Sequence, residues 1–242
     1  MNQISLNPSA IARVLGAVAF LLVLASIGGQ ATRFLLGHDY VKGLVPLFDV
    51  DRERNIPTFF AVLLAFFATL LLAVIAVLDG KRRTPHASKW AILSFGFLYI
   101  TYDEAFEVHE KLVSPVRTLL GDGNLGVFSF AWVIPGIALV IVLAMFFLKF
   151  WLHLPTTARL TFLVAATLYL GGSIGFELIG GGYAELHGQD NLTYKMITTI
   201  EESLEMAGVI TFIWALLAYL ADIHDEVRFR FDGARGEVTS LT

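Results

Sequence analysis

Long runs of apolar residues alternate with short polar segments along the whole chain. A helix needs about 20 mostly apolar residues to cross the hydrocarbon core of a bilayer. Six segments satisfy that requirement, namely residues 10–36, 57–78, 89–110, 127–151, 157–179 and 201–220. None shows the alternation of a transmembrane strand, and a helix satisfies its own backbone hydrogen bonds in lipid. The pattern predicts an all-α membrane protein, a bundle of six transmembrane helices forming one domain over residues 1–242, with a short polar tail at 221–242.

Proline and glycine punctuate these runs. Pro57 is expected at the first helical position of the second span, because its missing N–H is unpaired there in any case. Pro135 lies inside the fourth span and predicts a kink. Gly180-Gly181-Gly182 is expected to end the fifth span. Gly171 and Gly175, spaced four apart, predict close approach of the fifth helix to a neighbour.

Composition supports the membrane interpretation. The chain is 56% hydrophobic and only 16% charged, whereas soluble domains carry about 25% charged residues. The absence of cysteine excludes thiolate metal sites and cysteine nucleophiles. A formal net charge of −4 argues against nucleic acid as a partner. The expected partners are the lipid bilayer and other membrane-protein subunits.

The basic residues predict the orientation. Six spans place both termini on one side of the membrane, and ten of the 17 Lys and Arg residues fall on that side. Because Lys and Arg are enriched in cytoplasmic loops, both termini are expected to be cytoplasmic. By the same division, 15 of the 21 acidic residues fall on the outer side or in the helix ends facing it. Acids contribute little to topology, so this asymmetry points to function.

Three segments at the outer level carry the candidate site residues. They are the end of the third span, the fifth span and the start of the sixth, with Asp103, Glu104, Glu107, His109, Glu110, Glu177, Glu201, Glu202 and Glu205. Acids inside a membrane are costly and usually face a bundle interior in pairs. Several carboxylates in one place need protons, basic partners or a bound metal. Candidate basic partners are Lys111, Arg33, Arg52, Arg54 and Lys195.

Helical spacing favours a shared face. At 100° per residue, Asp103, Glu107 and Glu110 fall within about 60° of each other, and His109 lies about 120° away. Oxygen ligands suit Ca²⁺, Mg²⁺ or Mn²⁺, and a histidine would admit Fe or Zn. We therefore expect a divalent metal ion of unknown identity as cofactor. In the simpler alternative, Glu201 and Glu202 merely stabilise the N-terminus of the sixth helix.

Two further signals are weaker. The segment Phe48-Asp49-Val50-Asp51-Arg52-Glu53 alternates three acids and resembles part of a calcium loop, but it lacks the glycine and distal glutamate of the full motif, so a solvated loop is the preferred interpretation. Trp90, Trp132, Trp151 and Trp214 are interpreted as interface anchors and packing residues.

A combination of motifs resembles a known family. The motifs are FDVDRERNIPT at residues 48–58, Asp103-Glu104-Ala105 with His109-Glu110, and Glu201-Glu202 with Glu205-Met206. Together they resemble an uncharacterised family of bacterial multi-pass inner-membrane proteins. The resemblance covers most of the chain and implies a bacterial inner-membrane location, with no established activity.

These observations favour an inner-membrane protein whose outward-facing carboxylate and histidine cluster binds a divalent cation, and they leave open whether the site is catalytic. One alternative is a non-catalytic subunit of a larger complex that docks through its acidic outer face. A second is a proton- or cation-coupled transporter. Carriers usually bind near the membrane midplane, and these acids are expected at one membrane face.

Overall fold

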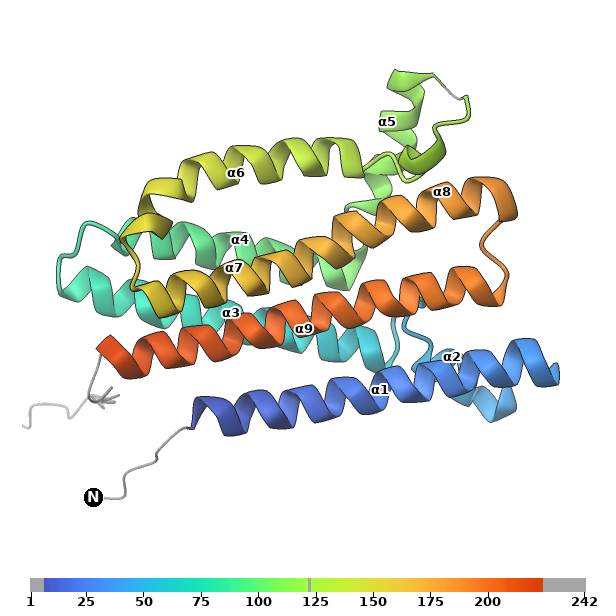
Figure 1. Cartoon of the computed structure of the whole chain (residues 1–242), viewed down its shortest axis with the longest axis horizontal. Helices are drawn as coiled ribbons and strands as arrows, with labels where there is room; N and C mark the ends of the chain where they lie inside the picture. The colour runs from blue at the N-terminus through green and yellow to red at the C-terminus, as the bar shows by residue number, and fades with distance from the viewer. Residues whose placement is uncertain (1–6, 122, 224–242) are drawn as a thin grey trace, which may run out of the picture.

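The computed structural model describes residues 7–121 and 123–223, and every regular element in those ranges is a helix. Six long helical segments run alongside one another in alternating directions (Figure 1). They are α1 (Pro8–Leu36), α3 (Ile56–Lys81), α4 (Ala87–Phe106), α6 (Val133–His153), the continuous segment α7 (Thr156–Leu170), η4 (Gly171–Phe176) and α8 (Glu177–His187), and α9 (Leu192–Ile223). The η4 segment is a π-helical turn.

Short helices connect the long ones. They are η1 (Val41–Gly43), α2 (Leu44–Phe48), η2 (Glu110–Leu112), α5 (Val113–Leu120) and η3 (Gly126–Phe128). The start of α1 and the end of α9 lie at the same end of the bundle, called here the terminal end (Figure 1). The opposite end, where α1 and α8 finish and α9 begins, is called the distal end.

Five of the six long segments are long and apolar enough to cross a membrane, and α4 is the exception. It carries Lys89, Asp103 and Glu104 within its 20 residues. Of the polar tail predicted at 221–242, residues 224–242 lie outside the described residues.

The helix ends follow local chemistry. The side chains of Asn7 and Asn55 accept hydrogen bonds from the first turns of α1 and α3, each of which has proline in its first turn. The α1 helix ends at Gly37, which adopts the left-handed conformation (φ 71°). Asn191 accepts a 2.9 Å hydrogen bond from the Tyr194 N–H at the start of α9.

The apolar core lies between α3, α4 and α9, toward the terminal end. Leu72, Ile75, Trp90, Ile213 and Leu216 are completely buried there. The ring of Trp90 contacts Phe150 edge-on with 4.9 Å between centroids, which confirms a packing role for this tryptophan. Buried apolar side chains therefore fill the centre of the bundle toward its terminal end.

Several predicted boundaries are wrong, and two of them move the acidic residues. The third span was expected to continue to Glu110, but α4 ends at Phe106 because Glu107 adopts left-handed backbone angles (φ 52°, ψ 47°). The sixth span was expected to start at Glu201, but α9 starts at Leu192. Glu201 and Glu202 therefore lie well inside the helix, and the interpretation of these two residues as helix caps is wrong.

The other differences concern α6 and α8. The fourth helix begins at Val133 rather than 127, so Pro135 lies in its first turn, where proline requires no kink. Gly180–Gly182 do not end the fifth helix, which continues to His187. The lack of side chains on these glycines allows close packing, because a Cβ on Gly181 would lie 3.1 Å from the carbonyl oxygen of Val127.

Candidate functional site

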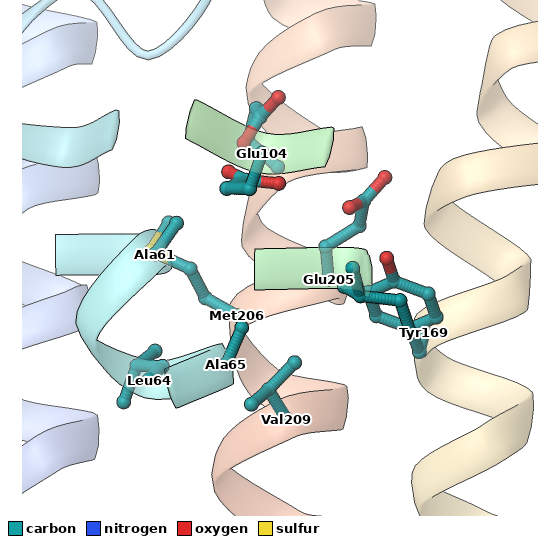
Figure 2. A pocket seen from close by; sticks show the side chains of 10 residues that line it. Ala61, Leu64, Ala65, Glu104, Tyr169, Glu205, Met206 and Val209 are labelled. Atoms are coloured by element: carbon teal, nitrogen blue, oxygen red, sulfur yellow. The ribbon is translucent and has the colours of Figure 1, made fainter. Parts of the chain in front are cut away.

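A small cavity between α3, α4, α7 and α9 contains the most deeply placed acids. Its lining combines three glutamates and a tyrosine with six apolar residues, namely Glu104, Glu202, Glu205 and Tyr169, and Ala61, Leu64, Ala65, Ile100, Met206 and Val209. Its volume for a water-sized sphere is about 20 Å³, enough for about one water molecule. In Figure 2 the carboxyl groups and the Tyr169 hydroxyl gather on one side, and Leu64, Ala65 and Val209 lie on the other. We call Glu104, Glu202, Glu205 and Tyr169 the cavity group.

Two glycines bring the cavity group together by allowing very close helix contact. A Cβ on Gly172, in the π-helical turn, would lie 2.7 Å from the carbonyl oxygen of Glu201 and 2.8 Å from Cγ of Glu205. A Cβ on Gly208 would lie 2.6 Å from the backbone nitrogen of Tyr169. The sequence pattern had indicated Gly171 and Gly175 for this role. Neither makes a close approach at the Cβ position, so that assignment is wrong by one residue.

A second group of acids lies beside Trp132, in the first turn before α6. The indole Nε1 of Trp132 donates a 2.7 Å hydrogen bond to Oε1 of Glu177. The carboxyl groups of Glu177 and Glu201 are themselves within hydrogen-bonding reach. Trp132 was interpreted as an interface anchor or packing residue. It does pack, on the His109 ring, and its polar edge also holds one of the candidate acids. No sequence signal distinguishes it from the other tryptophans.

Asp103 and His109 form a close pair just beyond the end of α4. One carboxylate oxygen of Asp103 accepts the His109 backbone N–H at 2.8 Å, and the other lies 2.9 Å from His109 Nδ1. The His109 ring also packs on Trp132, with 4.7 Å between centroids. Because the helix ends at Phe106, the chain folds back and brings His109 to Asp103. The expectation that Asp103, Glu107 and Glu110 share one helical face, with His109 turned away, is therefore wrong.

The electrostatics of His109 follow from these contacts. Burial of the ring opposes protonation, but the hydrogen bond and charge of Asp103, with the charges of Glu110 and Glu177, outweigh it and raise the pKa of His109 above its ordinary 6.5. The Asp103–His109 pair therefore favours the charged imidazolium more than an isolated histidine would.

Three acids gather at the distal end outside the helices. Glu107 and Glu110 interact with each other, and Glu53 approaches both from the loop before α3. Burial first, and then the charges of Glu107 and Glu110, raise the pKa of Glu53 from 4.5 to about 7. Burial and the charge of Glu107 also raise the pKa of Glu110, and the charge of His109 partly offsets this increase. We call Glu53, Glu107 and Glu110 the outer acids. Sequence analysis assigned Glu53 to a solvated acidic loop before the second span and did not group it with the candidate site residues.

Most of the expected basic partners are engaged elsewhere. Arg33 lies 2.7 Å from Asp190, Arg52 lies 3.4 Å from Asp49, Lys195 pairs with Asp51, and the Lys111 ammonium donates to the carbonyl oxygen of Phe106. Two of the loop acids thus have structural roles, since Asp49 is buried at 2% exposure and Asp51 pairs with Lys195. The prediction of a solvated loop is wrong for these two and holds for residues 52–54, which are exposed. Within the described ranges, the only ion pair to a candidate acid is that of His109 with Asp103.

The candidate ligands fall into three neighbouring groups and do not converge on one point. In the part of the chain that the structure describes, no three His, Asp or Glu side chains are arranged to hold a metal ion. Helical spacing alone had grouped the acids by segment. Helix packing regroups them by depth, with Glu104, Glu202 and Glu205 deepest, Glu177, Glu201 and the Asp103–His109 pair next, and Glu107 and Glu110 at the distal end.

The five apolar spanning helices fit a multi-pass membrane protein of helical-bundle architecture. A family model described as a domain of unknown function (DUF8692) matches residues 14–220. The chain belongs to this family, which agrees with the resemblance to an uncharacterised family. Comparison with curated proteins and with solved structures gives no match.

Proposed function

We propose that the protein binds a cation at the cavity group, from the distal side of the membrane. The observation that carries the proposal is that Glu104, Glu202 and Glu205 line one small cavity together with Tyr169. Carboxylates gathered in one small, mostly apolar-lined cavity repel one another, so such a group requires protons or a bound cation. Most of the basic side chains that might have neutralised it are held by other partners.

The depth of the cavity supports a site embedded in the membrane. Glu205 lies 13 residues after Leu192 and 18 residues before Ile223, about 20 Å from one end of α9 and about 27 Å from the other. Sequence analysis had placed these acids at the outer face and used that position against a carrier. The depth of Glu205 removes that objection. Toward the terminal end, however, Leu72, Ile75, Ile213 and Leu216 are completely buried, so the site communicates with the distal side only.

The proposed topology has six spans, with α4 as the third, in a bacterial inner membrane with both termini cytoplasmic. The 20 residues of α4 extend over about 30 Å, the thickness of the hydrocarbon core. Two of its three charged residues lie in its last turn. The excess of Lys and Arg on the side of the termini supports the orientation.

A divalent metal ion is the first candidate for the cation. Glutamate oxygens and a tyrosine hydroxyl are hard ligands that suit Mg²⁺, Mn²⁺ or Ca²⁺. A space for one water molecule is of the size that a small ion requires, and glutamate side chains can rotate toward it. Glu104, Glu202 and Glu205 are not arranged around one point in the structure, so they would hold the metal only after their side chains turn toward it.

A proton is the second candidate, and the contact between Glu177 and Glu201 favours it. Two carboxyl groups at hydrogen-bonding distance are compatible only when they share a proton or a cation. If the bound cation is a proton, the acids exchange protons with the distal side of the membrane, and Tyr169 donates or accepts hydrogen bonds within the cavity group.

The test is cation binding by detergent-purified protein after removal of metal. Wild type is titrated with Mn²⁺, Mg²⁺, Ca²⁺ and Zn²⁺ by calorimetry, alongside Glu202→Gln and Glu205→Gln. Glu185→Gln is the matched control, because Glu185 accepts a 2.7 Å hydrogen bond from Ser129 and does not line the cavity. We expect one bound ion in wild type and in the control, with affinity lowered at least about tenfold in both cavity variants, or about 1.4 kcal/mol.

Infrared difference spectra between low and high pH separate the proton candidate. If no metal binds, carboxyl C=O bands that titrate in wild type and Glu185→Gln but change in Glu205→Gln support proton binding. The proposal would be overturned if folded wild type bound no metal and also showed no carboxyl band that depends on Glu205.

A further inference from the structure

The two ends of the bundle differ in how their charges are paired. Within residues 7–121 and 123–223, every ion pair lies toward the distal end. Toward the terminal end, the same ranges contain only two acids, Asp79 and Asp222. The basic residues there, such as Lys89 and Lys149, form no ion pair with either acid. The terminal end therefore presents positive charge that the acids of the described chain do not neutralise.

Four basic side chains gather at one place on this end, where α6 finishes beside the start of α4 (Figure 1). The Lys89 ammonium lies 3.3 Å from the centre of the Phe146 ring. The rings of His86 and His153 lie 5.7 Å apart between centroids, and Lys149 lies between Phe146 and His153 along α6. We call His86, Lys89, Lys149 and His153 the basic cluster. It joins side chains from two spanning helices that are distant in the sequence.

The basic cluster lies at the depth of a lipid head group. Lys89 is two residues from the start of α4, and Lys149 is four residues from the end of α6. Their backbones are therefore only about 3–6 Å inside the helix ends. Lysine side chains near the end of a spanning helix lay their methylene groups on apolar surface and extend the ammonium toward the interface. Lys89 is partly buried with its ammonium on an aromatic ring, as this arrangement requires.

One face of α6 continues from the basic cluster as an exposed apolar stripe. Leu139, Val142 and Phe146 are 54%, 56% and 46% exposed, and Lys149 and His153 follow them at helical spacing. At 100° per residue, all five residues fall within about 80° of one another. The apolar part of the stripe extends over about 10 Å. A molecule lying on this face thus meets apolar side chains along its length and basic groups at its end.

We propose that the basic cluster binds an anionic phospholipid of the leaflet at the terminal end. The phosphate lies at Lys89 and Lys149, and an acyl chain lies along the apolar stripe formed by Leu139, Val142 and Phe146. Lysine ammonium groups bind phosphate as point charges with three hydrogen-bond donors each. A zwitterionic lipid carries its own positive charge, which the cluster repels, so it gains less from the same contacts. The site is separate from the cavity group and stands whether or not that group binds a cation.

The experiment compares two lipids with the same acyl chains and different head-group charge. Detergent-purified full-length protein is titrated separately with dioleoylphosphatidylglycerol and dioleoylphosphatidylcholine, and bound lipids are counted by native mass spectrometry. Lys89→Gln/Lys149→Gln removes both ammonium groups of the basic cluster. The matched control is Lys81→Gln/Arg83→Gln, which removes the same charge from exposed residues of the terminal end outside the cluster. Thermal unfolding checks that each variant is folded.

A second cluster variant, Lys149→Gln/His153→Gln, replaces two exposed residues and keeps the test decisive if the first variant fails to fold. We expect wild type and the control to bind one phosphatidylglycerol at least about tenfold more tightly than phosphatidylcholine, or by about 1.4 kcal/mol. Both cluster variants should lose this preference.

Three results would overturn the proposal. Equal affinity of wild type for the two lipids would show ordinary lipid contact. An equal loss in the control would show a general attraction of the positive end, and an unchanged preference in a folded cluster variant would place the lipid elsewhere. Excess inorganic phosphate at constant ionic strength should leave the lipid bound. Displacement by phosphate would assign the cluster to a free anion and would likewise contradict a lipid site.

Discussion

Trp132 and Glu177 are joined by a 2.7 Å hydrogen bond from the indole N–H to the carboxylate. This bond links the residue just before α6 to α8, and the indole ring also packs on His109. One tryptophan thereby connects the Asp103–His109 pair to the Glu177–Glu201 pair. The candidate site is held together by a residue that has no charge and belongs to no recognisable motif.

Replacing Trp132 should therefore destabilise the protein. Trp132→Phe keeps much of the aromatic packing but removes the donor to Glu177, and a hydrogen bond to a charged group contributes about 1.5–3 kcal/mol. Denaturant unfolding in detergent measures the change. The matched control is Trp214→Phe, because the Trp214 N–H donates a longer, exposed bond of 3.3 Å to Ser9. Equal stability of the two variants would contradict the structural role assigned to Trp132.

Gly208→Ala should be more harmful than an ordinary glycine substitution in a helix. The added methyl would lie 2.6 Å from the Tyr169 backbone nitrogen and 2.9 Å from its Cα, and backbone atoms cannot move aside as a flexible side chain can. Overpacking of this kind costs about 1–3 kcal/mol. Gly16→Ala in α1 has open space at the same position and should be neutral or stabilising, by up to about 1 kcal/mol. Thermal unfolding of both variants tests the contrast.

The Asp103–His109 pair predicts a pH dependence of stability. The pKa of His109 is raised in the folded protein, so the pair's stabilising contribution is complete below the unfolded pKa of about 6.5 and is lost as pH rises through the folded pKa. The stability difference between wild type and His109→Gln should thus be largest below pH 6.5 and shrink at higher pH. His38→Gln, an exposed histidine after α1, is the control. A difference that grew with pH would refute the assignment.

The Asp51–Lys195 ion pair should fasten the loop before α3 to the start of α9. Its two side chains are only 16% and 12% exposed, so solvent screens them less than a surface pair. A double-mutant cycle with Asp51→Asn and Lys195→Met should give a coupling free energy of about 0.5–3 kcal/mol. The same cycle on Arg33 and Asp190, whose aspartate is 79% exposed, should give about 0–1 kcal/mol. Equal couplings would show that the loop is not held this way.

Much of the fold was predictable because it depends on local sequence. The long apolar runs predicted helices in all six segments, and Pro57 marked the start of α3 to within one residue. Errors arose where the backbone departs from a regular pattern. Glu107 adopts a left-handed conformation that ends α4 early, and no local signal in a run of acidic and apolar residues indicates that turn. Gly180–Gly182 were misinterpreted for the opposite reason, since close packing keeps a glycine-rich segment helical.

By itself, the sequence determined that the chain forms apolar helices and that many of its acids belong to three of its segments. Both properties follow from composition along one stretch of chain. Only the tertiary structure decided which acids meet, because that depends on the rotation and depth of each helix. Gly172 and Gly208 set the approach of α7 and α9, which places Glu205 near the middle of the bundle beside Glu104.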